Sequence, residues 1–316
     1  MAVELLDRNL LFVTGKGGVG KTTVAAGLAL LAAQNGRRVL LCESDAKGSV
    51  AQAFEVSPLE FAEREVSPGL WAMAMSTEES LREYLRLQLR LPLVARLGPL
   101  ARTFDFVANA APGVKEILVV GKLCWEVRSG AWDLVVVDAP ATGHIVGQLG
   151  APEAMRQLVN VGTVRDQTDW MLEILGDPQQ TGVVVVATPE EMPVNETIEL
   201  ADRLREQTNV DLAAVVVNRV LPELFGRGEE EVFRRLQQPE VADVLADAAG
   251  GDVQPMLDGA DLAVRLRRTR AGHLNALRHG IGDGPELLYI PELFKRSDGV
   301  RATRQIATAL GAELGY

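Results

Sequence analysis

The residues best suited to chemistry in this 316-residue chain stand together in one short segment, residues 15–23. The segment fits the pattern GxxxxGK[ST], and a second lysine, Lys16, occupies its second position. In such a loop the glycines let consecutive backbone N–H groups point at phosphate oxygens. We expect Lys21 to reach the β- and γ-phosphates of a nucleotide and the Thr22 hydroxyl to bind Mg²⁺. The predicted nucleotide-binding residues are Gly15, Lys16, Gly17, Gly18, Val19, Gly20, Lys21, Thr22 and Thr23.

The sequence around this loop has the strand–loop–helix order that the pattern requires. An apolar run, Leu10–Val13, precedes the loop, and a helical pattern, Val24–Ala33, follows it. The alternative, a plain glycine-rich turn, does not explain a matching acidic strand end elsewhere. Such an end exists, because the apolar run Leu134–Val137 leads directly into Asp138. We expect Asp138 to hold Mg²⁺, directly or through a water ligand.

A second acidic loop, Glu43–Gly48, follows another apolar run. Transfer of a phosphoryl group to water needs a residue that orients the attacking water in line with the γ-phosphate. We expect Asp45 to have this role. The alternative is that Asp45 caps a helix that begins near Ser49.

Two later strand ends are candidates for contact with the nucleotide base. Asn218 is expected to hydrogen-bond a purine edge, although an asparagine at such a turn can equally serve the local backbone. The segment that contains Pro291 and Leu293 is expected to cover the base.

Seven short, β-branched apolar runs alternate with helical patterns and must position these side chains. Runs that are apolar throughout suit parallel strands covered on both faces. The sequence therefore predicts an α/β fold with a doubly wound, mostly parallel sheet of about 7–8 strands, and ligands at the carboxyl ends of the strands. The runs are Leu10–Thr14, Val39–Cys42, Leu70–Met75, Leu134–Asp138, Val183–Ala187, Ala213–Val217 and Leu287–Ile290.

Two stretches, about 77–129 and about 145–178, do not fit the alternation and read as helical. Because both interrupt the sheet at the same end, we expect a single domain over residues 1–316 with an inserted helical subdomain above the nucleotide. Leucines recur every three or four residues in the first stretch, which suits a buried helix. The alternative is an apolar groove for another protein's helix. Residues 229–280 are also expected to be helical, with a solvated charged face.

Composition narrows the classes of function. The net charge of −11 argues against nucleic acid as the main partner, because nucleic-acid binding needs a basic surface. Two cysteines, Cys42 and Cys124, suit a reducing cytosol rather than a disulfide framework. The sequence shows no signal-peptide layout and no apolar stretch near the ~20 residues of a membrane span. We therefore expect a cytoplasmic protein.

The phosphate loop with its extra lysine resembles the deviant Walker A loop of the dimeric P-loop ATPases. Within that group the chain resembles the family of the arsenite-pump ATPase and the ATPase that targets tail-anchored membrane proteins. The similarity extends from the N-terminus to about Phe294. The segments that carry it, besides the loop, are Gly69–Met75, Ala111–Gly113 with Glu116, Asp138–His144 and Val217–Arg219.

This resemblance implies Mg²⁺-dependent hydrolysis of ATP by a homodimer, or by a heterodimer with a paralogous ATPase. It implies that Lys16 reaches across to the partner's nucleotide, that Asp45 polarises the attacking water, and that Asn218 lies near adenine. ATP binding would close the dimer and hydrolysis would reopen it. The implied partner is a hydrophobic protein client or a membrane protein.

The chain also departs from the family. Asp45–Ser49 reads Asp-Ala-Lys-Gly-Ser where the targeting ATPases usually read Asp-Pro-Ala-His-Asn. The zinc-binding Cys-x-x-Cys pair of the eukaryotic members is replaced by Leu266-Arg-Arg268, so we expect no zinc. Neither Cys42 nor Cys124 suits an arsenite site or an iron–sulfur redox subunit. Two alternatives remain: a membrane- or DNA-positioning ATPase, and a regulatory ATP-binding partner of a paralogous ATPase.

Overall fold

The fold is built on one sheet that runs through the whole molecule. The computed structural model describes residues 4–45, 47–89, 113–159, 161–293 and 298–316. Within these ranges the strands are β1 (Leu10–Gly15), β2 (Val39–Glu43), β3 (Arg64–Ser67), β4 (Leu70–Ala74), β5 (Leu134–Asp138), β6 (Thr181–Ala187), β7 (Leu212–Val220) and β8 (Glu286–Pro291). They form an eight-stranded sheet in the order β3-β4-β2-β5-β1-β6-β7-β8. Every neighbouring pair is parallel except β3 and β4.

The predicted α/β fold is confirmed, and all seven apolar runs form strands. The eighth strand, β3, was not predicted, because an edge strand that is only partly buried carries no apolar run. The buried strands β1, β2, β5 and β6 lie at the centre, and no side chain in them is exposed.

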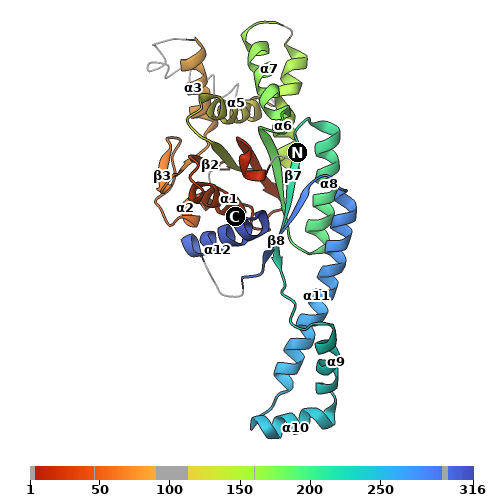
Figure 1. The fold of residues 1–316 in the computed structure, drawn as a ribbon. Coiled ribbons are helices and arrows are strands. Elements are labelled where there is room, and N and C mark those ends of the chain that lie inside the picture. The colour runs from red at the N-terminus through yellow and green to blue at the C-terminus, as the bar shows by residue number, and fades with distance from the viewer. Residues whose placement is uncertain (1–3, 46, 90–112, 160, 294–297) are drawn as a thin grey trace.

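Helices cover both faces of the sheet (Figure 1). Among the described residues, each helix is either too short or too polar to cross a lipid bilayer. Besides a short 3₁₀ turn at Leu5–Asp7, the helices are α1 (Lys21–Gln34), α2 (Ser49–Ala53), α3 (Thr77–Leu89), α5 (Val114–Ser129), α6 (Thr142–Leu158), α7 (Thr163–Gly176), α8 (Glu191–Gln207), α9 (Arg227–Leu236), α10 (Pro239–Ala249), α11 (Gln254–Ile281) and α12 (Gly299–Leu314).

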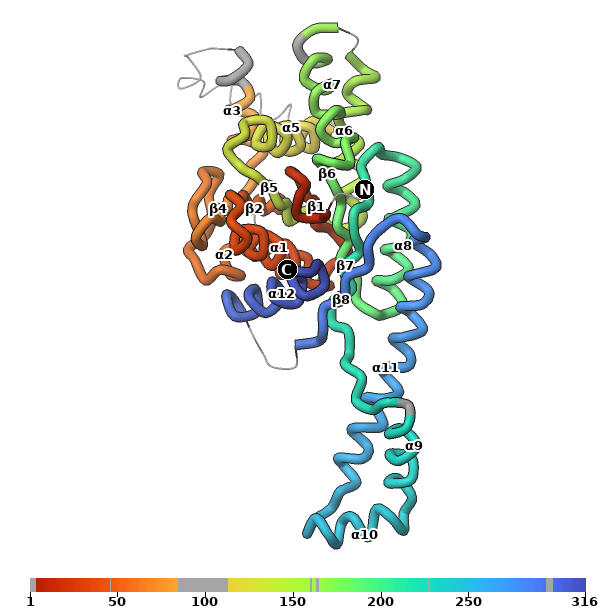
Figure 2. Tube along the Cα trace, viewed as in Figure 1, coloured from red at the N-terminus to blue at the C-terminus, as the bar shows by residue number. Residues whose placement is uncertain are grey.

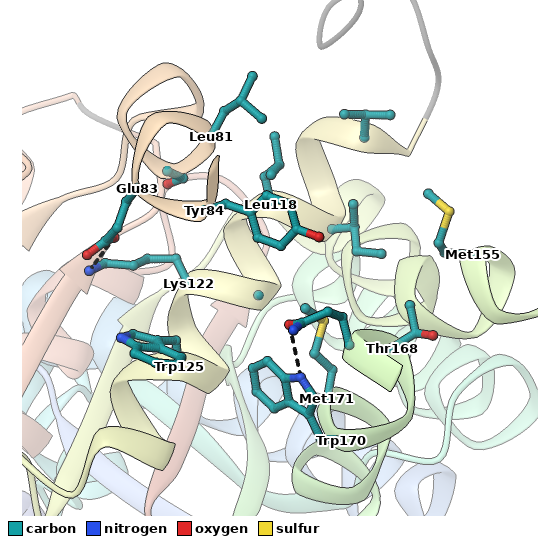
Figure 3. Close-up of a pocket in the computed structure, with 15 residues that line it drawn as sticks. Leu81, Glu83, Tyr84, Leu118, Lys122, Trp125, Met155, Thr168, Trp170 and Met171 are labelled. Carbon is teal, nitrogen blue, oxygen red and sulfur yellow. Dashed lines mark hydrogen bonds and ion pairs between the residues drawn. The ribbon is translucent and has the colours of Figure 1, made fainter. Parts of the chain in front are cut away.

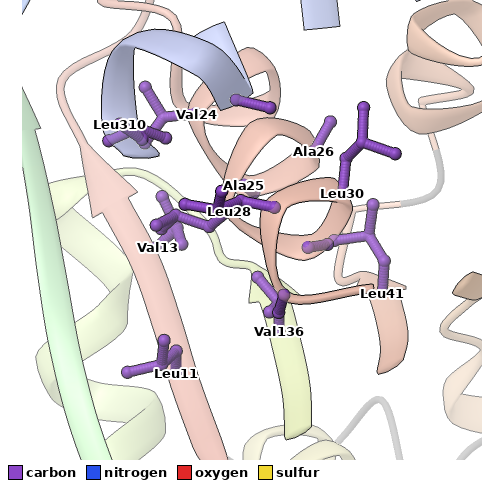
Figure 4. Packing of buried hydrophobic residues seen from close by; sticks show 14 of the residues in the cluster. Leu11, Val13, Val24, Ala25, Ala26, Leu28, Leu30, Leu41, Val136 and Leu310 are labelled. Carbon is purple, nitrogen blue, oxygen red and sulfur yellow. The ribbon is translucent and has the colours of Figure 1, made fainter. Parts of the chain in front are cut away.

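Helix α1 is the best-buried helix and carries the end of the phosphate loop, from Lys21 onward. Ten consecutive residues, Val24–Ala33, are buried between the sheet and α12. Figure 4 shows Leu28 of α1 against Val13 and Val136 of the sheet, with Leu310 of α12 on the other side. Because α1 is enclosed on all sides, its first turn is held in a fixed position relative to the strand ends.

The helices on the opposite face include both stretches that interrupt the strand–helix alternation. α3 packs on α5, and α6 packs on α5 and α7, so the two stretches lie against each other. α5 and α6 also cover the sheet, where Val120, Leu123 and Ile145 are fully buried. The later leucines of the predicted stripe, Leu93 and Leu97 among them, lie outside the described residues.

A helical arm extends from the body on the side away from α3 and α7 (Figure 2). It consists of α9, α10 and the first half of the 28-residue helix α11, which then returns to pack on α8. A small core around Phe233 and Leu257 holds the arm together, and Phe225 stacks on Phe233 with ring centroids 4.8 Å apart. The helical prediction for residues 229–280 is confirmed apart from short turns, but no sequence pattern indicated that this segment would project.

Candidate functional site

The phosphate loop connects the end of β1 to the start of α1 and depends on its glycines. Gly15, Gly18 and Gly20 all have positive φ, at 148°, 86° and 96°. A Cβ on Gly15 would lie 2.2 Å from the Val186 carbonyl oxygen, and one on Gly20 would lie 2.5 Å from Asn218 Nδ2. No side chain caps α1 at Gly20, so its first turn offers backbone N–H groups to a ligand. The loop therefore has the backbone of an anion site.

Beside the loop, three side chains form a site that fits a divalent cation. The Thr22 hydroxyl donates a hydrogen bond to Asp138 Oδ2 at 2.6 Å. Glu43 lies next to Asp138 on the neighbouring strand, in direct register. Both carboxylates are buried, and Asp138 Oδ1 and Glu43 Oε2 have no hydrogen-bond partner in the described part of the chain. Hydroxyl and carboxylate oxygens are hard ligands, so these residues fit Mg²⁺ with phosphate and water as its other ligands.

The protein alone does not fully compensate the charged groups of this site, Asp138 and Lys21. Burial raises the pKa of Asp138 to about 6, and the nearby negative charges of Glu43 and Asp45 contribute to the rise. The Thr22 hydrogen bond and the Lys21 ammonium act against it. Burial also lowers the pKa of Lys21, although Asp138 opposes that shift. A bound cation and a polyphosphate would compensate both groups.

The two lysines of the loop point to different partners. Lys21 Nζ donates to the Lys16 carbonyl oxygen at 3.2 Å and so stays within the loop. The Lys16 side chain instead forms an ion pair with Glu196 on α8. The other carboxylate oxygen of Glu196 accepts a 3.5 Å hydrogen bond from Thr142, which follows Asp138 at the start of α6. Glu196 thus connects the loop lysine to the segment after β5, a role that no sequence pattern indicated.

The two carboxylates of the acidic segment after β2, Glu43 and Asp45, have different partners. Glu43 Oε1 accepts hydrogen bonds from the N–H groups of Ser49, at 2.7 Å, and Val50, at 3.4 Å. The capping of α2, which was the alternative role for Asp45, therefore belongs to Glu43. Asp45 is half-exposed and pairs with Lys47 Nζ at 3.1 Å. Among the described residues, Lys47 is the partner that the structure gives the Asp45 carboxylate.

The predicted base contacts lie near the ends of the neighbouring strands β7 and β8. Asn218 Nδ2 donates to the Val19 carbonyl at 2.8 Å, and Asn218 Oδ1 accepts the N–H of Arg219 at 2.9 Å, so this amide serves the backbone. Pro291 is exposed at the end of β8, and Leu293 packs partly buried against the core.

A cavity of about 810 Å³ opens beside the phosphate loop. It is lined by Gly18 and Gly20–Thr23 of the loop, and by residues at the starts of α2 and α12, among them Ser49 and Asp298. Pockets that bind small molecules and cofactors typically have volumes of roughly 300–1,000 Å³. The loop with Thr22 and the starts of α2 and α12 thus surround a space large enough for a nucleotide.

Comparison with known proteins places the chain among ATPases. The sequence profile of the anion-transporting ATPases matches residues 8–166 and 158–242. ATPase BagA of Mycobacterium tuberculosis is 34% identical over 221 residues, which cover 66% of this chain and 64% of that protein. An arsenical pump-driving ATPase of Acidiphilium multivorum is 27% identical over 238 residues, 67% of this chain and 40% of that protein.

A third relative, ATPase GET3 of Podospora anserina, is 25% identical over 284 residues, 77% of this chain and 84% of that protein. The chain thus covers less than two thirds of the length of BagA and most of the length of GET3.

Proposed function

The chain belongs to the anion-transporting ATPase family, and from this premise we propose that it binds ATP with Mg²⁺ and hydrolyses the β–γ phosphate bond as one subunit of a homodimer. The observation that carries the proposal is the pairing of Thr22 with buried Asp138 at the first turn of α1, beside Lys21. The direct test is release of phosphate from ATP by the purified chain, with and without Mg²⁺. ATP binding without Mg²⁺-dependent turnover would favour the regulatory alternative instead.

Each residue at the site has a defined task in this reaction. Lys21 and the N–H groups of the loop would bind the β- and γ-phosphates, and Thr22 and Asp138 would hold Mg²⁺, which would supply positive charge to neutralise the phosphates. Asp45, half-exposed on its loop, orients the attacking water. The 3.1 Å pair between Asp45 and Lys47 must open for Asp45 to do so, because both side chains are otherwise engaged with each other.

Asp45→Asn is expected to slow hydrolysis at least ~100-fold while ATP affinity changes less than about threefold. The reason is that asparagine keeps the shape of the loop but cannot polarise water as a carboxylate does. Turnover is measured as phosphate release, and affinity with a fluorescent ATP analogue. Asp247→Asn, an exposed change on α10, is the matched control. Normal turnover by Asp45→Asn would contradict the assigned role.

We propose that Lys16 acts on the partner's nucleotide, which requires its ion pair with Glu196 to open. Lys16→Ala is then expected to lose turnover at least ~100-fold and to keep ATP binding by the monomer. The critical measurement mixes equal amounts of Lys16→Ala and Asp45→Asn proteins, each inactive alone. About a quarter of wild-type turnover should return, since half of the dimers are mixed and each mixed dimer has one complete site. No recovery would exclude a shared site.

The two cysteines support neither a metalloid nor an iron–sulfur site. Cys42 and Cys124 are free and fully buried, and burial raises the pKa of both thiols, that of Cys124 to about 12. Binding of such groups needs accessible thiolates. We place the protein in the cytoplasm, where unpaired thiols stay reduced.

A further inference from the structure

A second cavity, of about 220 Å³, lies between α3, α5, α6 and α7, far from the phosphate loop in the sequence (Figure 3). Its walls are mostly apolar and include Leu81, Ile117, Leu118, Trp125, Met155 and Met171. A dry cavity of roughly 150 Å³ accepts a benzene molecule. The volume here fits an apolar body slightly larger than benzene, such as a phenylethyl group. It is too small for a helix with a diameter of ~10 Å.

One wall of the cavity presents two hydroxyl groups without internal partners. Ser80 and Tyr84 lie one turn apart on α3, and both line the cavity. Ser80 is 3% exposed, and its Oγ has no hydrogen-bond partner among the described residues. The Tyr84 hydroxyl makes no hydrogen bond in that part of the chain either. A buried hydroxyl is rarely left unpaired, so Ser80 indicates a polar group supplied by a ligand, and the partly buried Tyr84 offers a second hydroxyl on the same wall.

The charged side chains beside these hydroxyls indicate whether the polar group of the ligand is positive or negative. Lys122 Nζ lies 2.7 Å from Glu83 Oε2 and 2.6 Å from Glu126 Oε1. All three side chains are largely buried, with 6%, 22% and 8% of their surfaces exposed. One ammonium therefore faces two carboxylates, and the cluster carries an excess negative charge next to the cavity. Glu83, which shares α3 with the hydroxyls, lines the cavity itself.

Aromatic rings add to the preference for a positive ligand. Tyr84, Trp125 and Trp170 line the cavity, and aromatic faces attract cations. The positive side chain of Arg128 contacts the Trp170 ring at 5.2 Å but does not line the cavity. A carboxylate ligand would meet Glu83 and find no unpaired cation, since Lys122 is already shared by two carboxylates.

We propose that this cavity binds a small hydrophobic amine. The ammonium group donates to the Ser80 and Tyr84 hydroxyls and compensates the excess charge of the Glu83–Lys122–Glu126 cluster, while the hydrocarbon part fills the space against Leu118 and Met171. The site is distinct from the phosphate loop, and the inference does not depend on the proposed ATPase activity.

The test compares three probes that share one skeleton and differ only in the polar group: 2-phenylethylamine, 2-phenylethanol and phenylacetate. Binding to the full chain is measured by calorimetry at pH 7.5 without nucleotide. The amine should bind roughly tenfold more tightly than the alcohol, and phenylacetate should not bind. Equal binding of amine and alcohol, tighter binding of phenylacetate, or no binding of the amine would each overturn the proposal.

Glu83→Gln should reduce the affinity for the amine roughly tenfold and leave that for the alcohol unchanged. The matched control is Glu79→Gln, which removes the same charge from the exposed side of α3, where Glu79 pairs with Arg82. Ser80→Ala is a second variant in case Glu83→Gln does not fold, and should weaken binding of the amine severalfold. The assignment to this cavity is refuted if Glu83→Gln and Ser80→Ala, or whichever of the two folds, bind the amine with wild-type affinity.

Discussion

Lys21→Ala is expected to abolish measurable ATP turnover, at least a ~1,000-fold loss, and to weaken ATP affinity at least ~100-fold. The Lys21 ammonium stays within the loop, whereas the Lys16 ammonium is paired with Glu196 on α8. Burial has already lowered its pKa, so its ammonium is poorly solvated and gains from a phosphate partner. Alanine keeps the glycines of the loop and removes the ammonium together with its hydrogen bond to the Lys16 carbonyl oxygen.

The measurement pairs phosphate release with titration of a fluorescent ATP analogue. Lys115→Ala, an exposed lysine on α5, is the matched control and should behave as the wild type. Retention of ATP affinity within threefold in Lys21→Ala would mean that the phosphates lie elsewhere, and the proposed function would fail with it.

Asp138→Asn is expected to reduce Mg²⁺-dependent turnover at least ~100-fold and, without ligands, to raise the melting temperature by several degrees at pH 7.5. In the folded chain the pKa of Asp138 is about 6, above its ordinary value near ~3.9. The folded state therefore loses stability as pH rises from about 4 to about 6, by about 3 kcal/mol in total. Asparagine avoids this loss because it carries no charge.

The sign of this effect can be tested by pH. Because this stability is lost between about pH 4 and about pH 6, the difference in melting temperature between wild type and Asp138→Asn should shrink at pH 5 and disappear near pH 4. Asp133, at the opposite end of β5, is the control, because hydrogen bonds from Arg38 lower its pKa to about 2. Asp133→Asn should therefore destabilise the chain slightly at pH 7.5 and leave turnover unchanged. A lower melting temperature for Asp138→Asn at pH 7.5 would contradict the imbalance of charge at the site.

Hydrophobic patterning predicted the body of the fold well, because a strand buried on both faces must be apolar throughout. It failed for β3, an edge strand whose residues are only partly buried and whose Glu65 is exposed. Patterning also predicted that the arm is helical, but it did not predict how the helices of the arm are arranged. A helix that projects and a helix that packs on the body share the same periodicity, and the contacts that distinguish them are not local.

The resemblance to the arsenite-pump and tail-anchor-targeting ATPases, stated from the phosphate loop and the strand ends, is confirmed by the family match. The sequence predicted some residues of the candidate site and missed others. Glu43 ends an apolar run just as Asp138 does, so the same signal could have identified it. Glu196 lies within α8 with no motif around it, and only the folded chain brings it to Lys16.

The close contact between α1 and α12 has a consequence for synthesis of the protein. Gly27 lies against Ile306 so closely that a Cβ on Gly27 would come within 2.7 Å of the Ile306 side chain. The helix that begins at the phosphate loop is made early on the ribosome, yet its outer surface stays uncovered until α12 emerges. A nascent chain therefore exposes one of its most apolar helices during most of translation, and the site should become able to retain a nucleotide only after α12 has docked.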